Sequence, residues 1–135
     1  MFDTVVIATD GSTSVRRAVE AALDIASTFD ASAVHALYVD AAETDPDRRA
    51  PETTAEEALT AVADGADREV VTAVREGDPV EEICAYAEEV GADLLATGTR
   101  GRHGEHSYLL GSVAEGVARN SEAPVLTARQ LGSER

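Results

Sequence analysis

The residues with the clearest chemical potential form a glycine-rich stretch, Gly98-Thr99-Arg100-Gly101, which is followed after nine further residues by Gly111-Ser112. This stretch comes directly after residues 93–97, an apolar run typical of a strand, and leads into a helix expected to begin near Ser112. Glycines let a backbone approach a ligand closely, and a helix start presents unpaired N–H groups and the positive end of a dipole. The pattern therefore suits a phosphate chain. The alternative is a plain capping box, with Ser112 as N-cap and Glu115 at N3.

The net charge of the chain limits the classes of partner that it can bind. It carries 26 acidic residues against 11 basic ones, for a net charge of −15 over 135 residues, and every basic residue is arginine. A field of that sign repels the phosphates of a nucleic acid, so we expect no nucleic acid partner. The acids are spread along the whole chain. This spread favours adaptation to concentrated salt over a local acidic patch for a cationic partner.

Length and composition predict one cytoplasmic domain. The 135 residues suffice for a single core, here expected over residues 1–135, with 44% hydrophobic residues. No opening stretch has the form of a signal peptide, and no apolar run is long enough to cross a bilayer, so we expect no membrane partner. The one cysteine, Cys84, shares a helical face with apolar residues, which favours a buried filler over a nucleophile.

Strand-like and helix-like segments alternate along the sequence. We expect strands over residues 4–8, 33–39, 70–74, 93–97 and 124–128. We expect a first helix over 15–29, whose apolar residues from Val15 to Phe29 share one face that lies on the sheet. We expect further helices from a capping box at Thr54 to about Gly65, from Asp78-Pro79 to Gly91, and from Ser112 to about Asn120. Ser12 to Ser14 are candidates to cap the first helix.

This alternation predicts a doubly wound α/β domain, with a parallel sheet and helices on both faces. Ligands of such sheets bind beyond the carboxyl ends of the strands, where the strand order reverses. Asp10 follows the first expected strand and Gly98 follows the fourth. The two converge on one crevice if these strands are neighbours, which the spacing of the elements does not decide.

The glycine spacing and its surroundings resemble the universal stress protein family. The resemblance covers essentially the whole chain and rests on Gly98-x2-Gly101-x9-Gly111-Ser112, with Val5 to Ser12 at the start and Pro124-Val125-Leu126 near the end. It implies a five-stranded sheet in the order 3-2-1-4-5. It also implies the ATP-binding branch, because members without nucleotide generally lack this spacing. Family members commonly form dimers through the last strand, so we expect a homodimer through residues 124–128, an apolar edge open to pairing.

The resemblance also implies the residues that meet the nucleotide. Residues 8–10 would contact adenosine, with Asp10 near the ribose or a Mg²⁺ ion, and Val39 would contact adenine. Gly98 to His103 would wrap the phosphates, and Gly111 to Val113 would bind them from the helix start. The full set is Ala8, Thr9, Asp10, Val39, Thr97, Gly98, Thr99, Arg100, Gly101, Arg102, His103, Gly111, Ser112 and Val113.

Several of these side chains have ordinary alternatives. Asp10 precedes Gly11 and can serve as a turn former, and the loop arginines can be solvated charges. His103 can contact phosphate, whereas His106 is expected in solvent, and neither suggests a zinc site because no third ligand is evident. Residues 105–108 depart from the serine-, glycine- and arginine-rich loop of the family. His35, in an apolar strand, is expected as a satisfied buried histidine.

These observations favour a nucleotide-dependent regulatory module over an enzyme. A Walker-type NTPase is excluded because its phosphate loop requires a lysine, and the Gly-x-Ser-x-Gly pattern of α/β-hydrolases does not occur. No residue stands out as a base that would activate water. The alternatives that stay open are a slow ATPase or adenylyl-transferring enzyme, and a scaffold that binds AMP, another adenine nucleotide or nothing.

Overall fold

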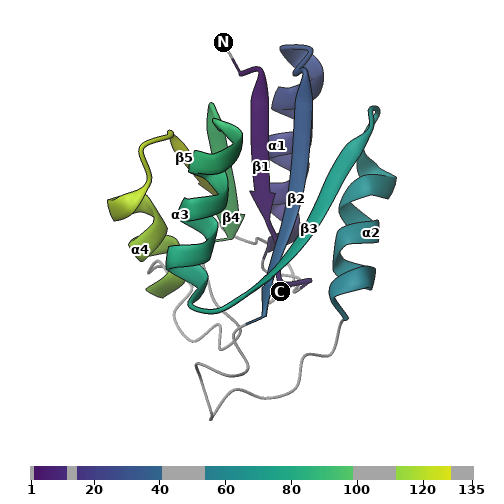
Figure 1. The fold of residues 1–135 in the computed structure, drawn as a ribbon. Helices are drawn as coiled ribbons and strands as arrows, with labels where there is room; N and C mark the ends of the chain where they lie inside the picture. Colours follow the sequence, from purple (N-terminus) through teal and green to yellow (C-terminus); the bar gives the residue numbers. More distant parts are fainter. Residues whose placement is uncertain (1, 12–14, 41–53, 99–111, 129–135) are drawn as a thin grey trace, which may run out of the picture.

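The chain forms a five-stranded parallel sheet in the order β3-β2-β1-β4-β5, with helices on both faces (Figure 1). The computed structural model describes residues 2–11, 15–40, 54–98 and 112–128. The strands are β1 (Thr4–Ala8), β2 (Ala33–Asp40), β3 (Val70–Glu76), β4 (Leu94–Gly98) and β5 (Val125–Ala128). The helices are α1 (Arg16–Thr28), α2 (Ala55–Gly65), α3 (Pro79–Val90) and α4 (Ser112–Asn120). The expected doubly wound fold and strand order are confirmed.

Two of the helix starts confirm the caps expected from the sequence. At α2, the Thr54 hydroxyl accepts from the backbone N–H of Glu57 at 3.1 Å, and the Glu57 carboxylate accepts in return from the Thr54 N–H at 3.0 Å. At α3, the Asp78 carboxylate accepts from the Glu81 N–H at 3.0 Å, and Gly91 ends the helix at φ 69°. Side-chain acceptors of this kind satisfy the donors that a helix start leaves unpaired.

The first helix departs from expectation at both ends. Val15 occupies its N-cap position with no side-chain capping bond, and the residues proposed as caps, 12–14, lie outside the described part of the chain. Phe29, expected on the buried face, lies just beyond the end of α1 and is 50% exposed. Its ring meets Phe2 edge-on at 5.2 Å between centroids. The helical spacing stops applying once the helix ends, so Phe29 packs at the amino edge of the sheet instead.

The two faces of the sheet bury separate apolar clusters. Val5 and Ile7 of β1 face α1 and α2, whereas Val6 and Ala8 face α3 and α4. All four are at most 5% exposed. Successive side chains of a strand point to opposite faces, so a continuous apolar run is what a strand covered on both faces requires.

Helices α3 and α4 pack closely at one glycine. A Cβ atom added at Gly116 of α4 would lie 2.7 Å from Cγ2 of Val80 and 3.2 Å from its Cγ1. Val80 is branched at Cβ and partly buried against the apolar cluster, so it has little room to move. Gly116 therefore allows α4 to lie close beside α3, which fixes where α4 begins relative to the sheet.

The strand order shows that β1 and β4 are neighbours, which the spacing of the elements along the sequence did not decide. β1 pairs with β4 in parallel, in the register Ile7 to Ala96, and with β2 on its other side, in the register Ala8 to Leu37. The chain crosses from β3 back to β4, so the order reverses between β1 and β4. Asp10 and Gly98 therefore follow neighbouring strands at one edge, where sheets of this type bind ligands. In the described part of the chain, no helix is long and apolar enough to span a membrane.

Candidate functional site

A tight turn follows β1 at the carboxyl edge of the sheet. The Thr9 side chain is only 7% exposed, and its Oγ1 accepts from the Gly11 N–H at 3.1 Å. The Thr9 N–H donates to the Leu37 carbonyl at 2.9 Å, which continues the pairing with β2, and Gly11 has φ 78°. Gly11 is needed because side chains resist that conformation. The turn holds the half-buried Asp10 at the carboxyl edge of the sheet, where β1 and β4 are neighbours.

The described members of the sequence-derived site gather at this same edge. Ala8, Thr9 and Asp10 end β1 or follow it, Val39 lies one residue before the end of β2, and Thr97 and Gly98 end β4. Ser112 and Val113 begin α4, which packs against α3 and over the apolar cluster that contains Val113. The structure thus brings together eight residues from four elements: Ala8, Thr9, Asp10, Val39, Thr97, Gly98, Ser112 and Val113.

The remaining members lie outside the described residues. These are Thr99, Arg100, Gly101, Arg102, His103 and Gly111, together with His106 of the same segment. The capping-box alternative at Ser112 also depends on side-chain positions that fall in this part of the chain. The backbone of α4 begins at Ser112, where the sequence predicted it, and Glu115 lies in its first turn.

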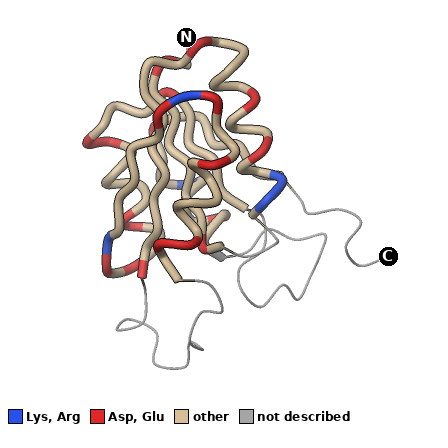
Figure 2. The backbone as a smooth tube through the Cα atoms, turned by 90° about the vertical axis from the view of Figure 1, so that its right-hand side faces the viewer, with Lys and Arg blue, Asp and Glu red and all other residues tan. Residues whose placement is uncertain are grey.

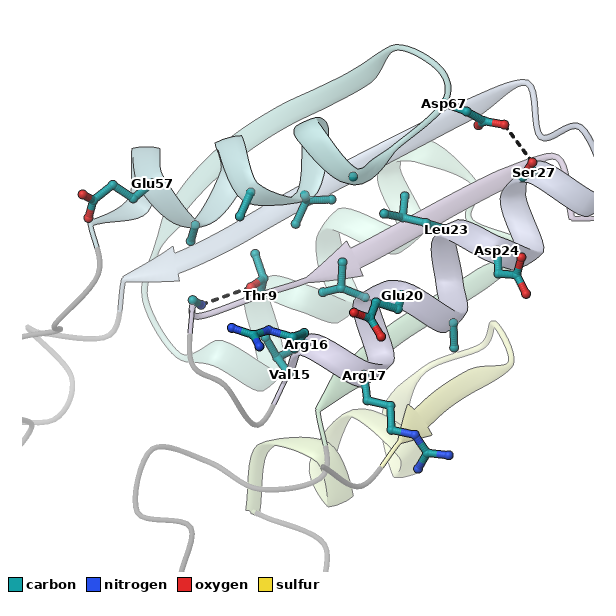
Figure 3. A pocket seen from close by; sticks show the side chains of 17 residues that line it. Thr9, Val15, Arg16, Arg17, Glu20, Leu23, Asp24, Ser27, Glu57 and Asp67 are labelled. Atoms are coloured by element: carbon teal, nitrogen blue, oxygen red, sulfur yellow. Dashed lines mark hydrogen bonds between the residues drawn. The ribbon is translucent and has the colours of Figure 1, made fainter. Parts of the chain in front are cut away.

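A groove of about 950 Å³ opens beside the turn, between α1 and α2 (Figure 3). Thr9 and Gly11 line its carboxyl end, and the Ser27 hydroxyl donates to the Asp67 carboxylate at 2.7 Å near its other end. Arg16 extends toward Thr9 in this view. The sequence reasoning did not single out Arg16, because an arginine in the first turn of a helix carries no distinctive pattern. Among the site residues that the structure describes, only Thr9 lines the groove, and its other described lining residues come mainly from α1 and α2.

Acidic residues are spread widely along the described backbone, with few basic residues among them (Figure 2). The described arginines that form ion pairs do so at the surface. Arg75 makes a two-pronged contact with Glu89 at 2.7 and 3.2 Å, and Arg68 pairs with Asp67 at 2.9 Å. The hydrogen bond from Arg75 lowers the pKa of the Glu89 carboxyl. Arg75 lies in the edge strand β3 and Arg68 just before it, so neither pair belongs to β1 or β4.

His35 and Cys84 belong to the structural part of the molecule. His35 Nδ1 lies 2.8 Å from the Tyr86 hydroxyl, so the histidine is satisfied as expected, although it is half-buried rather than fully buried. Burial lowers its pKa. Cys84 packs partly buried against the apolar cluster under α3, and burial raises the pKa of its thiol. A raised thiol pKa disfavours the thiolate, consistent with the interpretation as an apolar filler.

The described residues contain no group of three or more histidine, cysteine, aspartate or glutamate side chains placed to hold a metal ion. Mg²⁺ commonly takes only one or two carboxylates and fills its other positions with phosphate oxygens and waters. Asp10 is a carboxylate at this edge that fits such a role.

The fold is a doubly wound α/β domain. The strand order reverses at its carboxyl edge, as it does at the ligand sites of other sheets of this type. Residues 1–129 match the model of the universal stress protein family, and the chain belongs to that family.

Individual relatives agree with this assignment over most of their lengths. Universal stress protein MJ0531 of Methanocaldococcus jannaschii is 35% identical, and the alignment covers 99% of this chain and 86% of that protein. A crystal structure of a universal stress protein in complex with cAMP superposes with a TM-score of 0.75 at 31% identity, covering 96% of this chain and 98% of that one. The structure of protein MJ0577 superposes with a TM-score of 0.77 at 24% identity, covering 98% and 99% of the two chains, and supports the fold alone.

Proposed function

We propose that this protein binds ATP at the carboxyl edge of its sheet and acts as a nucleotide-dependent regulatory module of the stress response. The observation that carries the proposal is that Asp10 follows β1, Gly98 ends the neighbouring strand β4, and α4 begins after β4, all at the carboxyl edge of the sheet where its strand order reverses. A helix start and glycine backbone together suit phosphate groups. The domain of residues 1–135 would work in the cytoplasm.

Each part of the nucleotide is assigned to residues according to their type and their place in the fold. Residues 8–10 and Val39 would contact the adenosine, because they lie at the carboxyl ends of the neighbouring strands β1 and β2. Residues 98–103 and 111–113 would hold the phosphates, with Arg100 and Arg102 supplying cations in a chain that otherwise repels anions. Asp10 would contact the ribose or, together with phosphate oxygens, a Mg²⁺ ion.

The relatives support an adenine nucleotide more firmly than they support ATP. The relative solved with cAMP is 31% identical and aligns over almost the full length of both chains. AMP and other adenine nucleotides are therefore the alternative ligands for the same site. We propose ATP because the glycine spacing after β4 resembles that of the ATP-binding branch of the family.

The test is the identity and fate of the nucleotide. We expect ATP to be released when the purified protein is gently denatured, as measured by mass spectrometry. We also expect turnover below about one per second, the low end of ordinary enzyme rates, because no catalytic base is evident in the sequence. Release of no adenine nucleotide, together with no ATP binding by calorimetry, would overturn the proposal. Turnover faster than about one per second that Asp10→Asn abolishes would favour the alternative that the protein is an enzyme.

We further propose that two copies pair through β5. This strand is an edge of the sheet, and its four residues are only partly buried. Unpaired edges bind further strands readily, and a two-fold axis would pair β5 with itself. Because both copies are strongly acidic, the dimer should strengthen as salt rises. Light scattering should therefore give a dimer mass in molar KCl, and a monomer under that condition would contradict the proposal.

A further inference from the structure

Two threonines lie side by side on the face of the sheet that α4 covers. Thr97 of β4 and Thr127 of β5 are direct register partners. Their neighbours Leu95 and Val125 belong to the apolar cluster under α3 and α4, so the alternation of the strands directs both threonines to that face. Neighbouring strands are about 4.8 Å apart. One oxygen atom placed between the two hydroxyls can therefore accept from both, since each such bond spans about 2.7 Å.

The two threonines are the polar end of an otherwise apolar row. In register across the sheet, Ala73 of β3 pairs with Leu37 of β2, and Leu37 pairs with Ala8 of β1. Ala8 and Thr97 each follow the registered pair Ile7 and Ala96, so the row continues through them. Within this row, hydroxyl groups therefore occur only on β4 and β5, the two strands on the side of the sheet where α4 lies.

The Thr97 hydroxyl is buried without being satisfied. Thr97 is 7% exposed, and within the described part of the chain its hydroxyl has no hydrogen-bond partner. The hydroxyl of the half-buried Thr127 has none there either. Thr9 is equally buried, but its hydroxyl accepts from the Gly11 N–H. A buried polar group without a partner lowers stability, and such a group in a native protein calls for an explanation.

The position of the first turn of α4 indicates which kind of group the two hydroxyls would bind. Val113 and Val117 of α4 pack on the cluster that contains Leu95 and Val125. The two threonines lie two residues further along the same strands, toward the carboxyl edge of the sheet. The start of α4 is therefore next to the threonine pair. The N–H groups of a helix start and two hydroxyl donors together favour an anionic oxygen over a neutral one.

We propose that the hydroxyls of Thr97 and Thr127 form a subsite beneath the first turn of α4 that donates hydrogen bonds to a phosphate oxygen of the bound nucleotide. This inference rests on the proposed function and assigns to Thr127 a role that the sequence did not suggest. Within the described part of the chain neither hydroxyl has a protein partner, and the phosphate oxygen would supply one.

The experiment compares binding and stability in the same variants. Thr97→Val and Thr127→Val remove the hydroxyl and keep the shape, Thr97→Ser keeps a hydroxyl, and Thr72→Val is the matched control on the exposed part of edge strand β3. Titration calorimetry with ATP and with adenosine is carried out in molar KCl, and melting temperatures are measured without nucleotide.

We expect Thr97→Val to weaken ATP binding roughly 10- to 100-fold while adenosine binding stays within about twofold, because a hydrogen bond to a charged group is lost. Thr127→Val should show the same pattern, and Thr97→Ser and Thr72→Val should bind like wild type. The ligand-free Thr97→Val protein should melt at the wild-type temperature or a few degrees higher, since it no longer buries an unsatisfied hydroxyl.

Each contrary result has a separate meaning. Wild-type protein that binds neither ATP nor adenosine would refute the proposed function, and the subsite with it. Wild-type binding that Thr97→Val and Thr127→Val leave unchanged would refute the subsite alone. Equal losses for ATP and adenosine would refute the assignment to phosphate. A lower melting temperature of Thr97→Val would show that the hydroxyl is structural.

Discussion

Gly101→Val is expected to abolish ATP binding and to leave the fold largely intact. The reason comes from the sequence pattern, since Gly101 lies outside the described residues. In the pattern Gly98-x2-Gly101, the second glycine would bring the backbone against the phosphates. A side chain branched at Cβ would fill that space and resist a positive φ. The segment follows β4 at the carboxyl edge, so the two apolar clusters should be spared.

The measurement is titration calorimetry with Mg-ATP in molar KCl, with circular dichroism to check the fold. Asp10→Ala should weaken binding by less than Gly101→Val, since the loss of one ribose or metal contact leaves the main-chain donors in place. A hydrogen bond to a charged group contributes roughly 1.5–3 kcal/mol. If Gly101→Val binds ATP like wild type, the glycines serve only to lead the chain into α4.

Gly116→Ala is the matched control for a glycine whose role is packing. The added Cβ would lie 2.7 Å from Val80 Cγ2, so α3 and α4 must separate slightly. Overpacking of this kind typically costs about 1–3 kcal/mol. The variant should therefore melt at a lower temperature and, because the start of α4 shifts with the helix, lose some ATP affinity, but far less than Gly101→Val when it is folded. The two glycine variants thus separate the effect on the ligand from the effect on the fold.

Local signals made most of the secondary structure predictable from the sequence. The capping box at Thr54 and the Asp78-Pro79 start describe bonds between residues three apart, which need no tertiary information. The strands β1 and β4 were also evident, because burial on both faces imposes an unbroken apolar run. Element ends were less predictable: β3 continues to Glu76, two residues past its expected end, because its pairing with β2 extends through Asp40.

Features that depend on the tertiary arrangement were not predictable in the same way. The resemblance supplied the neighbour relation of β1 and β4, which the spacing of elements left open. The groove between α1 and α2 depends on how two helices lie on the sheet, and the pairing of Thr97 with Thr127 depends on strand register. Phe29 shows the same limit, because its helical spacing placed it on the buried face although α1 ends at Thr28.

The acidic surface is the other feature with a large expected consequence. The chain has a net charge of −15, and the described ion pairs offset little of the repulsion. The pair of Arg119 with Glu115 is 3.8 Å apart on exposed side chains, and the Asp30 side chain that pairs with Arg68 is 96% exposed. Exposed pairs of this type contribute about 0–1 kcal/mol at most. The folded state therefore concentrates negative charge that only dissolved ions can screen.

We expect the melting temperature to rise by about 10 °C or more between 0.1 M and molar KCl, given that one kcal/mol corresponds to a few degrees in a domain of this size. The Debye length falls from about 10 Å to about 3 Å over that range, which removes most of the repulsion between neighbouring carboxylates. Unfolding spreads the same charges apart, so the folded state gains more from screening than the unfolded state does. Differential scanning calorimetry at both salt concentrations measures the shift, with sodium acetate as a second salt to separate screening from a specific effect of chloride. An unchanged melting temperature would contradict adaptation to salt, and the acidic residues would then need another explanation, such as a cationic partner.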